Sequence, residues 1–241
     1  MELSILAIVI TFFSSLIGTI SGFGISTIMI PVLVTSYSLP QVLLFVAIIH
    51  LANDIWKLIL FHNGIRWHLL LYFGLAGFFA SIFGALLTIR LGMSPYFIQT
   101  FGLFLVMYAL FLVLKPKFAF KETPTTLLQG GAVSGFFYGL FGMGGLLRGM
   151  VLISFNMDKA VYLATSGAIS LIIDVTRVVV YRASGLVIGS NLLVSLLICI
   201  PISFIGAKAG EKIIQFVPQK QFRLMVSGFI LLMGIKLVLK I

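Results

Sequence analysis

The sequence is poor in charge and in cysteine. Only 9% of its 241 residues are charged, whereas about 25% are charged in a typical soluble domain. The single cysteine, Cys199, can form no internal disulfide, and no histidine or second cysteine stands at metal-ligand spacing from it. The three histidines form no convincing metal set, and neither a P-loop nor a dinucleotide fingerprint is present. We therefore expect no enzymatic activity, no metal and no cofactor.

Long apolar runs dominate what is present. Hydrophobic residues make up 61% of the chain, and the mean hydropathy is +1.21. An apolar run of about 18 residues or more is typical of a membrane-spanning helix, and residues 3–34 and 69–89 are examples. The first run lacks a basic start and a small-residue cleavage site, so we expect it to remain in the mature fold. We predict an all-α protein that crosses the lipid bilayer several times.

The net charge of +10 does not come from a basic patch. Lys and Arg are scattered among the ends of the apolar segments, a distribution that the positive-inside rule of membrane topology explains better than nucleic-acid binding does. We therefore expect the bilayer as the surroundings and no nucleic-acid partner. Association into a homo-oligomer stays open.

Glycine, proline and polar residues divide the chain into eight apolar segments. They span roughly residues 3–36, 40–62, 67–91, 95–115, 125–156, 158–183, 188–215 and 219–241. The one markedly polar connector lies at the midpoint. We predict a first membrane repeat over residues 1–115, a connector over 116–124 and a second membrane repeat over 125–241.

A shift of 120 residues superimposes the two halves. It pairs Gly22 with Gly142, Gly24 with Gly144, Leu51 with Leu171, Asp54 with Asp174 and Lys57 with Arg177, and a shift of 122 pairs Gly84 with Gly206. Glycine matches arise by chance in membrane proteins, but an aspartate followed three residues later by a basic residue is rare inside apolar helices. We interpret the pattern as an internal duplication.

Charge favours an inverted arrangement of these halves. Each half begins with a segment that glycines interrupt and that is too long for one simple crossing. If that segment enters and leaves on the same side, three further crossings turn the second half upside down. Ten Lys and Arg then lie on one side and five on the other, with Arg148 set aside, whereas single crossings give nine against six. We therefore predict an inverted repeat with both termini outside.

The two glycine clusters are the candidate substrate site. Unwound backbone at membrane depth is tolerated only where it lines a cavity or is buried in protein, and the helix N-terminus after each break favours an anion. Alternatively, the glycines only let helices pack closely. The cluster residues are Gly22 and Gly24 in the first half and Gly142, Gly144 and Gly145 in the second.

Arg148 stands three residues after the second cluster, in a stretch otherwise free of charge from Thr125 to Asn156. A guanidinium at membrane depth is costly unless water or a counter-ion reaches it. It could bind two oxygens of a sulfite, sulfonate or carboxylate group. Alternatively, it extends to the membrane interface or pairs with Asp54 or Asp174.

Asp54 with Lys57, and Asp174 with Arg177, place opposite charges one helical turn apart. Such pairs could lock the two repeats together, or they could handle substrate or protons. The charge count above takes Lys57 and Arg177 as charges on the two membrane sides.

His50 lies one turn before Asp54, with Asn53 beside the aspartate. A proton relay from His50 to Asp54 is conceivable, although an intramembrane histidine more often hydrogen-bonds a neighbouring helix. Five hydroxyl residues could bond a ligand or neighbouring helices in the same way: Ser21, Ser26, Thr165, Ser166 and Ser170.

At these residues the sequence resembles the sulfite exporter TauE/SafE family, also called the TSUP transporters. The likeness rests on two copies of a glycine-rich break, residues 18–31 and 135–145, on the chain length and on the two-half layout. The resemblance implies a permease of the cytoplasmic membrane that moves sulfite, a sulfonate or a related small organic anion outward. It also implies coupling to an ion gradient.

Secondary transport of a small anion is therefore the predicted function. One alternative is a channel, which would need a continuous polar pore, and the intramembrane polar residues are too few for one. Another is a structural or assembly subunit of a membrane complex, in which the glycines and ion pairs serve association alone.

Overall fold

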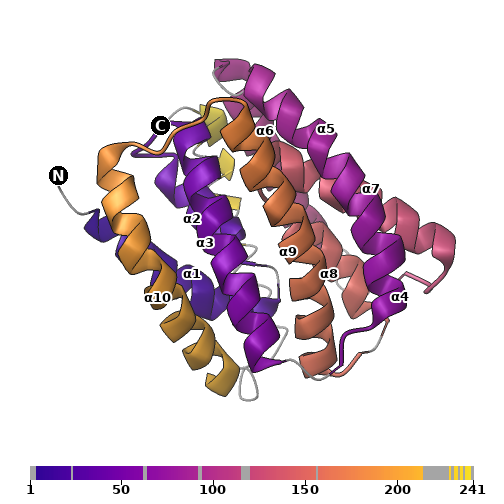
Figure 1. The fold of residues 1–241 in the computed structure, drawn as a ribbon. Helices are drawn as coiled ribbons and strands as arrows, with labels where there is room; N and C mark the ends of the chain where they lie inside the picture. The colour runs from indigo at the N-terminus through magenta and orange to yellow at the C-terminus, as the bar shows by residue number, and fades with distance from the viewer. Residues whose placement is uncertain are drawn as a thin grey trace.

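Every regular element that the structure describes is a helix, as predicted. The structure is a computed structural model, and Figure 1 shows its helices packed side by side in one bundle. It describes residues 4–22, 24–61, 64–91, 94–114, 120–155 and 157–213, and eight positions between 228 and 239.

The first half consists of a broken helix followed by three longer helical runs. Its elements are α1 (Ile5–Ser21), α2 (Ser26–Leu33), α3 (Leu39–Leu60), α4 (Trp67–Leu69), the π-helical turn η1 (Leu70–Gly74), α5 (Leu75–Leu91) and α6 (Pro95–Leu114). Pro40 stands in the first turn of α3 and Pro95 begins α6, where the missing proline N–H leaves no hydrogen bond unmade. The apolar segment predicted over 67–91 forms one continuous helical run with a π-helical turn near its start.

The second half repeats this order. Its elements are α7 (Pro124–Phe141), α8 (Gly145–Ile153), α9 (Lys159–Ala183) and α10 (Ser190–Ile213). Thr123 caps α7 by accepting a hydrogen bond from the Thr126 N–H at 3.1 Å. The predicted last segment, 219–241, lies for the most part outside the described residues.

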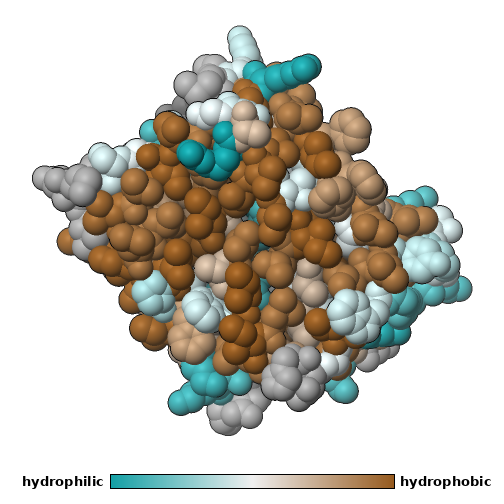
Figure 2. Space-filling view, in the orientation of Figure 1, coloured by the Kyte–Doolittle hydropathy of each residue, from teal (hydrophilic) through white to brown (hydrophobic). Residues whose placement is uncertain are grey.

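The outer surface is suited to lipid. Four helical runs are long and apolar enough to cross a bilayer, namely Leu39–Leu60, Trp67–Leu91, Lys159–Ala183 and Leu192–Ile213. Large apolar side chains such as Phe83 and Leu197 point outward. In Figure 2 apolar residues cover most of the visible face, and the hydrophilic residues gather toward its edges. The protein is a multi-pass membrane protein.

Packing between the helices repeats in the two halves. Helix α1 packs along α10, and α7 packs along α5 in the same way; likewise α3 contacts α10, and α9 contacts α5. Helices α3 and α9 contact each other. Gly84 of α5 lies against the α7 backbone, and Gly206 of α10 lies against the α1 backbone. These two glycines are the pair that the sequence shift aligned, so equivalent residues have equivalent packing roles.

Equivalent helices also run in opposite directions. In Figure 1 the chain leaves α3 at the lower edge of the bundle, whereas it leaves α9 at the upper edge and enters α10 there. This arrangement agrees with inverted halves. The inverted repeat, its boundaries and its orientation in the bilayer stay predictions.

Two basic residues that were counted as membrane-surface charges lie elsewhere. Lys57 and Arg177 are buried, with exposed fractions of 3% and 0%. Leaving them out changes the predicted charge bias from ten against five to nine against four. Six other basic residues lie outside the described residues: Lys115, Lys117, Lys220, Arg223, Lys236 and Lys240.

Candidate functional site

Both predicted helix breaks are present, and the glycines that end α1 and α7 have the same backbone conformation. Helix α1 ends at Gly22, which has φ 71°, and its N–H donates to the Gly18 carbonyl at 3.0 Å. Helix α7 ends at Gly142, which has φ 74°, and its N–H donates to the Tyr138 carbonyl at 2.8 Å. Glycine tolerates this left-handed backbone, whereas other residues are strained there. Helices α2 and α8 begin shortly after the breaks, as expected.

The glycines at the breaks lie against polar side chains. At Gly24, where φ is 89°, a Cβ atom would collide with His50 Nε2. At Gly142 a Cβ would lie 2.8 Å from Arg177 Nη2, and at Gly22 it would collide with the Tyr162 ring. At both breaks the missing side chain of glycine lets other side chains pack closely against the backbone, as the packing interpretation expects. Several of those side chains are ionisable.

The other two predicted glycines belong to the same second break. Gly144 lies against Tyr138, whose Cβ leaves no room for a side chain at that position, and Gly145 begins α8. Tyr162 donates a hydrogen bond of 3.3 Å to the Gly22 carbonyl and so holds the first break against α9.

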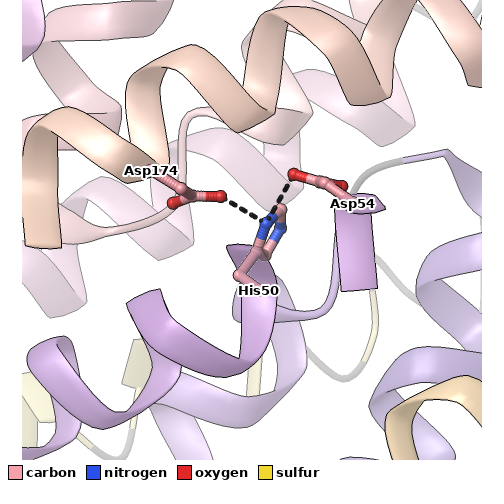
Figure 3. Close-up of side chains that lie close together, drawn as sticks. All are labelled: His50, Asp54 and Asp174. Atoms are coloured by element: carbon pink, nitrogen blue, oxygen red, sulfur yellow. Dashed lines mark hydrogen bonds and ion pairs between the residues drawn. The ribbon is translucent and has the colours of Figure 1, made fainter. Parts of the chain in front are cut away.

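His50 lies between two aspartates from different halves (Figure 3). Its Nδ1 is 3.0 Å from Asp54 Oδ2 on the same helix, α3, and 2.7 Å from Asp174 Oδ2 on α9. All three side chains are fully buried. Because spacing of four residues brings His50 and Asp54 onto one helical face, the sequence predicted the first contact. The contact of His50 with Asp174 could not be predicted in this way, because it depends on the packing of α3 against α9.

Each aspartate also has its own cation. Lys57 Nζ donates to Asp54 Oδ1 at 3.0 Å, and Arg177 Nη1 donates to Asp174 Oδ1 at 2.8 Å. These are the two pairs predicted from the sequence, and the equivalent positions of the halves form equivalent bonds. One ion pair on each of two crossing helices, with the imidazole between them, makes a single buried charge cluster.

Tyr138 of α7 is a member of this cluster that the sequence analysis missed. Its hydroxyl donates to Asp174 Oδ2 at 2.8 Å, and it lies 3.0 Å from His50 Nδ1 and 3.2 Å from Ser170 Oγ. The shift of 120 residues pairs Tyr138 with Gly18, so the repeat gave no signal for it. A tyrosine in an otherwise apolar and glycine-rich stretch was the only available hint.

Arg148 is buried close to this cluster, with 2% of its surface exposed. Its Nε donates to Ser166 Oγ at 2.9 Å, and its Cζ lies 5.8 Å from the centre of the Tyr138 ring. It does not extend to the surface, and within the described part of the chain it makes no ion pair with Asp54 or Asp174. The role of Arg148 in substrate binding stays a prediction.

The remaining predicted residues differ in their surroundings. Asn53 Nδ2 donates to Ser15 Oγ at 2.6 Å and so ties α3 to α1. Ser21 donates to the Ile17 carbonyl in its own helix, and Thr165 accepts from the Arg66 N–H at 3.1 Å. Ser26 Oγ is buried and has no hydrogen-bond partner among the described residues.

The histidine and the two aspartates also have the composition of a metal site, since ligand atoms of all three lie within 4.8 Å of one another. Each carboxylate, however, already accepts hydrogen bonds from a buried cation. A divalent metal would meet the positive charges of Lys57 and Arg177 at short range, which opposes its binding.

Comparison with known proteins identifies the family of the chain. The model of the family described as "Sulfite exporter TauE/SafE" matches residues 7–237. The chain belongs to this family. A curated protein of Methanocaldococcus jannaschii, named a "Probable membrane transporter protein", is 24% identical over 259 aligned positions. The alignment covers 97% of this chain and 95% of that relative. This member of the family is therefore a membrane transporter.

Proposed function

We propose that this chain is a secondary transporter that carries a small anion across the cytoplasmic membrane. Sulfite, a sulfonate and a related organic acid are the proposed substrates, and export is the proposed direction, as the family description suggests. Two broken helices that present backbone and helix N-termini to a shared interior are a known design for a substrate site in transporters. The site consists of the two glycine breaks, Arg148 and the charge cluster.

The balance of buried charge carries the proposal that the substrate is an anion. Among the described residues, the cations Lys57, Arg148 and Arg177 are buried together with only two carboxylates, Asp54 and Asp174. With the imidazole neutral, one positive charge is in excess. A buried charge without a partner is costly because little water remains to solvate it. A bound anion with one negative charge removes that cost.

Buried donors without acceptors support the same substrate class. Arg177 Nε and Nη2 and Ser26 Oγ have no hydrogen-bond partner among the described residues. Each of these atoms can donate a hydrogen bond, and the oxygens of an oxyanion accept without donating. Arg177 Nη2 lies beside Gly142, so this donor is close to the second break.

His50 is the proposed proton carrier. Its Nδ1 contacts both carboxylates, and its Nε2 faces Gly24 of the first break. Protonation adds a second positive charge to the cluster, and by electrostatic linkage this favours binding of an anion. The proton and the anion then cross together, so a proton gradient can drive anion movement.

Alternating access follows in this proposal from the two inverted halves, residues 1–115 and 125–241. The cluster joins α3 of one half to α9 of the other, so loading with a proton and an anion changes the contact between the halves. Rocking of one repeat against the other around a fixed site is the common mechanism in transporters of this design.

Uptake into proteoliposomes tests the proposal. Labelled sulfite and a simple sulfonate are offered with and without an imposed pH gradient, and we expect accumulation of at least one of them, faster with the gradient. Arg148→Gln should lower uptake by about 10–100-fold, because a charged hydrogen-bond donor to the anion is lost. Arg182→Gln is the matched control, since Arg182 is exposed and bonds the Leu186 carbonyl.

Each competing function predicts a different result. No uptake by the wild type would favour an assembly subunit, and uptake that neither saturates nor responds to the pH gradient would favour a channel. Full uptake by Arg148→Gln would show that the anion site lies elsewhere even if the protein is a transporter.

A further inference from the structure

Tyr138 occupies the position where the second break, Arg148 and the charge cluster meet. Its carbonyl accepts the N–H of Gly142 and so ends α7, and its Cβ packs against Gly144. The face of its ring lies 5.8 Å from Arg148 Cζ and 4.7 Å from Arg177 Cζ. Both distances are within the range of cation–π attraction.

The tyrosine hydroxyl belongs to the proton-carrying part of the cluster. It has one hydrogen, which it donates to Asp174 Oδ2 at 2.8 Å. The same oxygen lies 3.0 Å from His50 Nδ1 and 3.2 Å from Ser170 Oγ. Tyr138 therefore contacts both Arg148 and His50.

Charged groups surround the imidazole on several helices. Helix α3 contributes Asp54 and Lys57, α9 contributes Asp174 and Arg177, α7 contributes Tyr138 and α8 contributes Arg148. Helix α2 carries no ionisable side chain. A proton on His50 therefore acts directly on the two aspartates, and Tyr138 contacts both His50 and Arg148.

We propose that Tyr138 is the positioning residue that couples the anion at Arg148 to the proton at His50. The proposal rests on the proposed transport function and deepens it. The tyrosine ring fixes the guanidinium of Arg148 relative to the cluster, and the hydroxyl fixes His50 and Asp174 relative to the same ring. An anion at Arg148 and a proton on His50 then stabilise each other across one rigid side chain.

Removing the hydroxyl alone separates coupling from anion binding. Tyr138→Phe keeps the ring beside Arg148 and Arg177 but loses the bonds to Asp174 and His50. We expect stimulation of anion uptake by a pH gradient to fall at least about fivefold, the lower end of typical coupling factors, and to fall more than anion uptake down its own gradient does. The number of protons moved per anion should fall with it.

Tyr181→Phe is the matched control. Tyr181 is also buried, and its ring lies 5.6 Å from Arg177 Cζ, but its hydroxyl donates to the Gly139 carbonyl at 2.9 Å, outside the His50 cluster. Tyr181→Phe also loses one buried hydroxyl, so a general effect of that loss on packing or folding should appear in Tyr138→Phe and Tyr181→Phe alike. We expect Tyr181→Phe to keep the wild-type ratio of protons to anions.

Equal proton-to-anion ratios in the wild type, Tyr138→Phe and Tyr181→Phe would overturn the role of Tyr138 and leave transport intact. No uptake by the wild type would overturn the transport function, and this inference with it. Should Tyr138→Phe not fold, Ser170→Ala decides the matter, since it removes only the hydroxyl 3.2 Å from the Tyr138 oxygen. A partial loss of coupling supports the inference, and an unchanged ratio contradicts it.

Discussion

Asp174 and Arg177 form an ion pair from which water is excluded. Their atoms lie 2.8 Å apart, and both side chains have an exposed fraction of 0%. Loss of one partner from such a pair leaves the other charge buried and uncompensated, which costs about 3–5 kcal/mol. At the scale of the residue, therefore, this pair can be essential for stability whether or not it takes part in transport.

Asp174→Asn should lower the free energy of unfolding by about 3–5 kcal/mol. Adding Arg177→Gln should recover part of this loss, because the unpaired cation is removed with it. Chemical denaturation of the purified protein in detergent measures both. Glu122→Gln is the control. Glu122 and Arg66 form an ion pair of 2.8 Å that is partly exposed, and such a pair should contribute only about 0.2–1 kcal/mol to the free energy of unfolding.

The comparison also distinguishes the two roles suggested for the aspartates. If Asp174→Asn loses stability but keeps the wild-type ratio of protons to anions, the residue is structural alone. If it costs no more stability than Glu122→Gln, the ion pair does not hold α9 in place.

At the scale of the element, Gly24 in the first break has a left-handed backbone conformation and also lies against the His50 side chain. Gly24 has φ 89°, and the space that its Cβ would fill contains the His50 ring. An alanine there is strained in its backbone and also displaces the proposed proton carrier. Gly185 offers a natural comparison, because its φ is 82° but nothing lies within 4 Å of its Cβ position.

Gly185→Ala should cost about 1–2 kcal/mol, the strain of a left-handed backbone alone, and keep transport. Gly24→Ala should cost more and should abolish stimulation of uptake by a pH gradient. Thermal unfolding in detergent and proteoliposome uptake measure the two effects. Equal behaviour of the two variants would mean that Gly24 supplies only backbone freedom and that His50 does not depend on its position.

At the scale of the whole molecule, the spanning helices, the two breaks and the ion pairs within single helices could be predicted from the sequence. Apolar runs predicted the spanning helices because a bilayer demands continuous apolar length, and glycines marked both breaks because only glycine accepts φ near 70° at low cost. The Asp54 and Asp174 pairs followed from spacing within one helix. Each of these signals is local along the chain.

What the sequence did not predict depends on contacts between distant segments. The link from His50 to Asp174 joins residues of different halves, and Tyr138 has no equivalent in the first half, where Gly18 stands. Periodicity and internal repetition carry no information about such contacts. The charged pairs were predicted one by one, and only the crossing of α3 and α9 joins them into one cluster.

The most direct test at this scale is the internal pH of proteoliposomes when an anion gradient is the only driving force. A simple sulfonate, or another anion that uptake shows to be moved, is added outside without a pH gradient. We predict that wild-type protein carries protons inward with the anion and acidifies the interior, and that His50→Gln does not. Entry of the anion at the wild-type rate with no change of internal pH would contradict coupled transport through the His50 cluster.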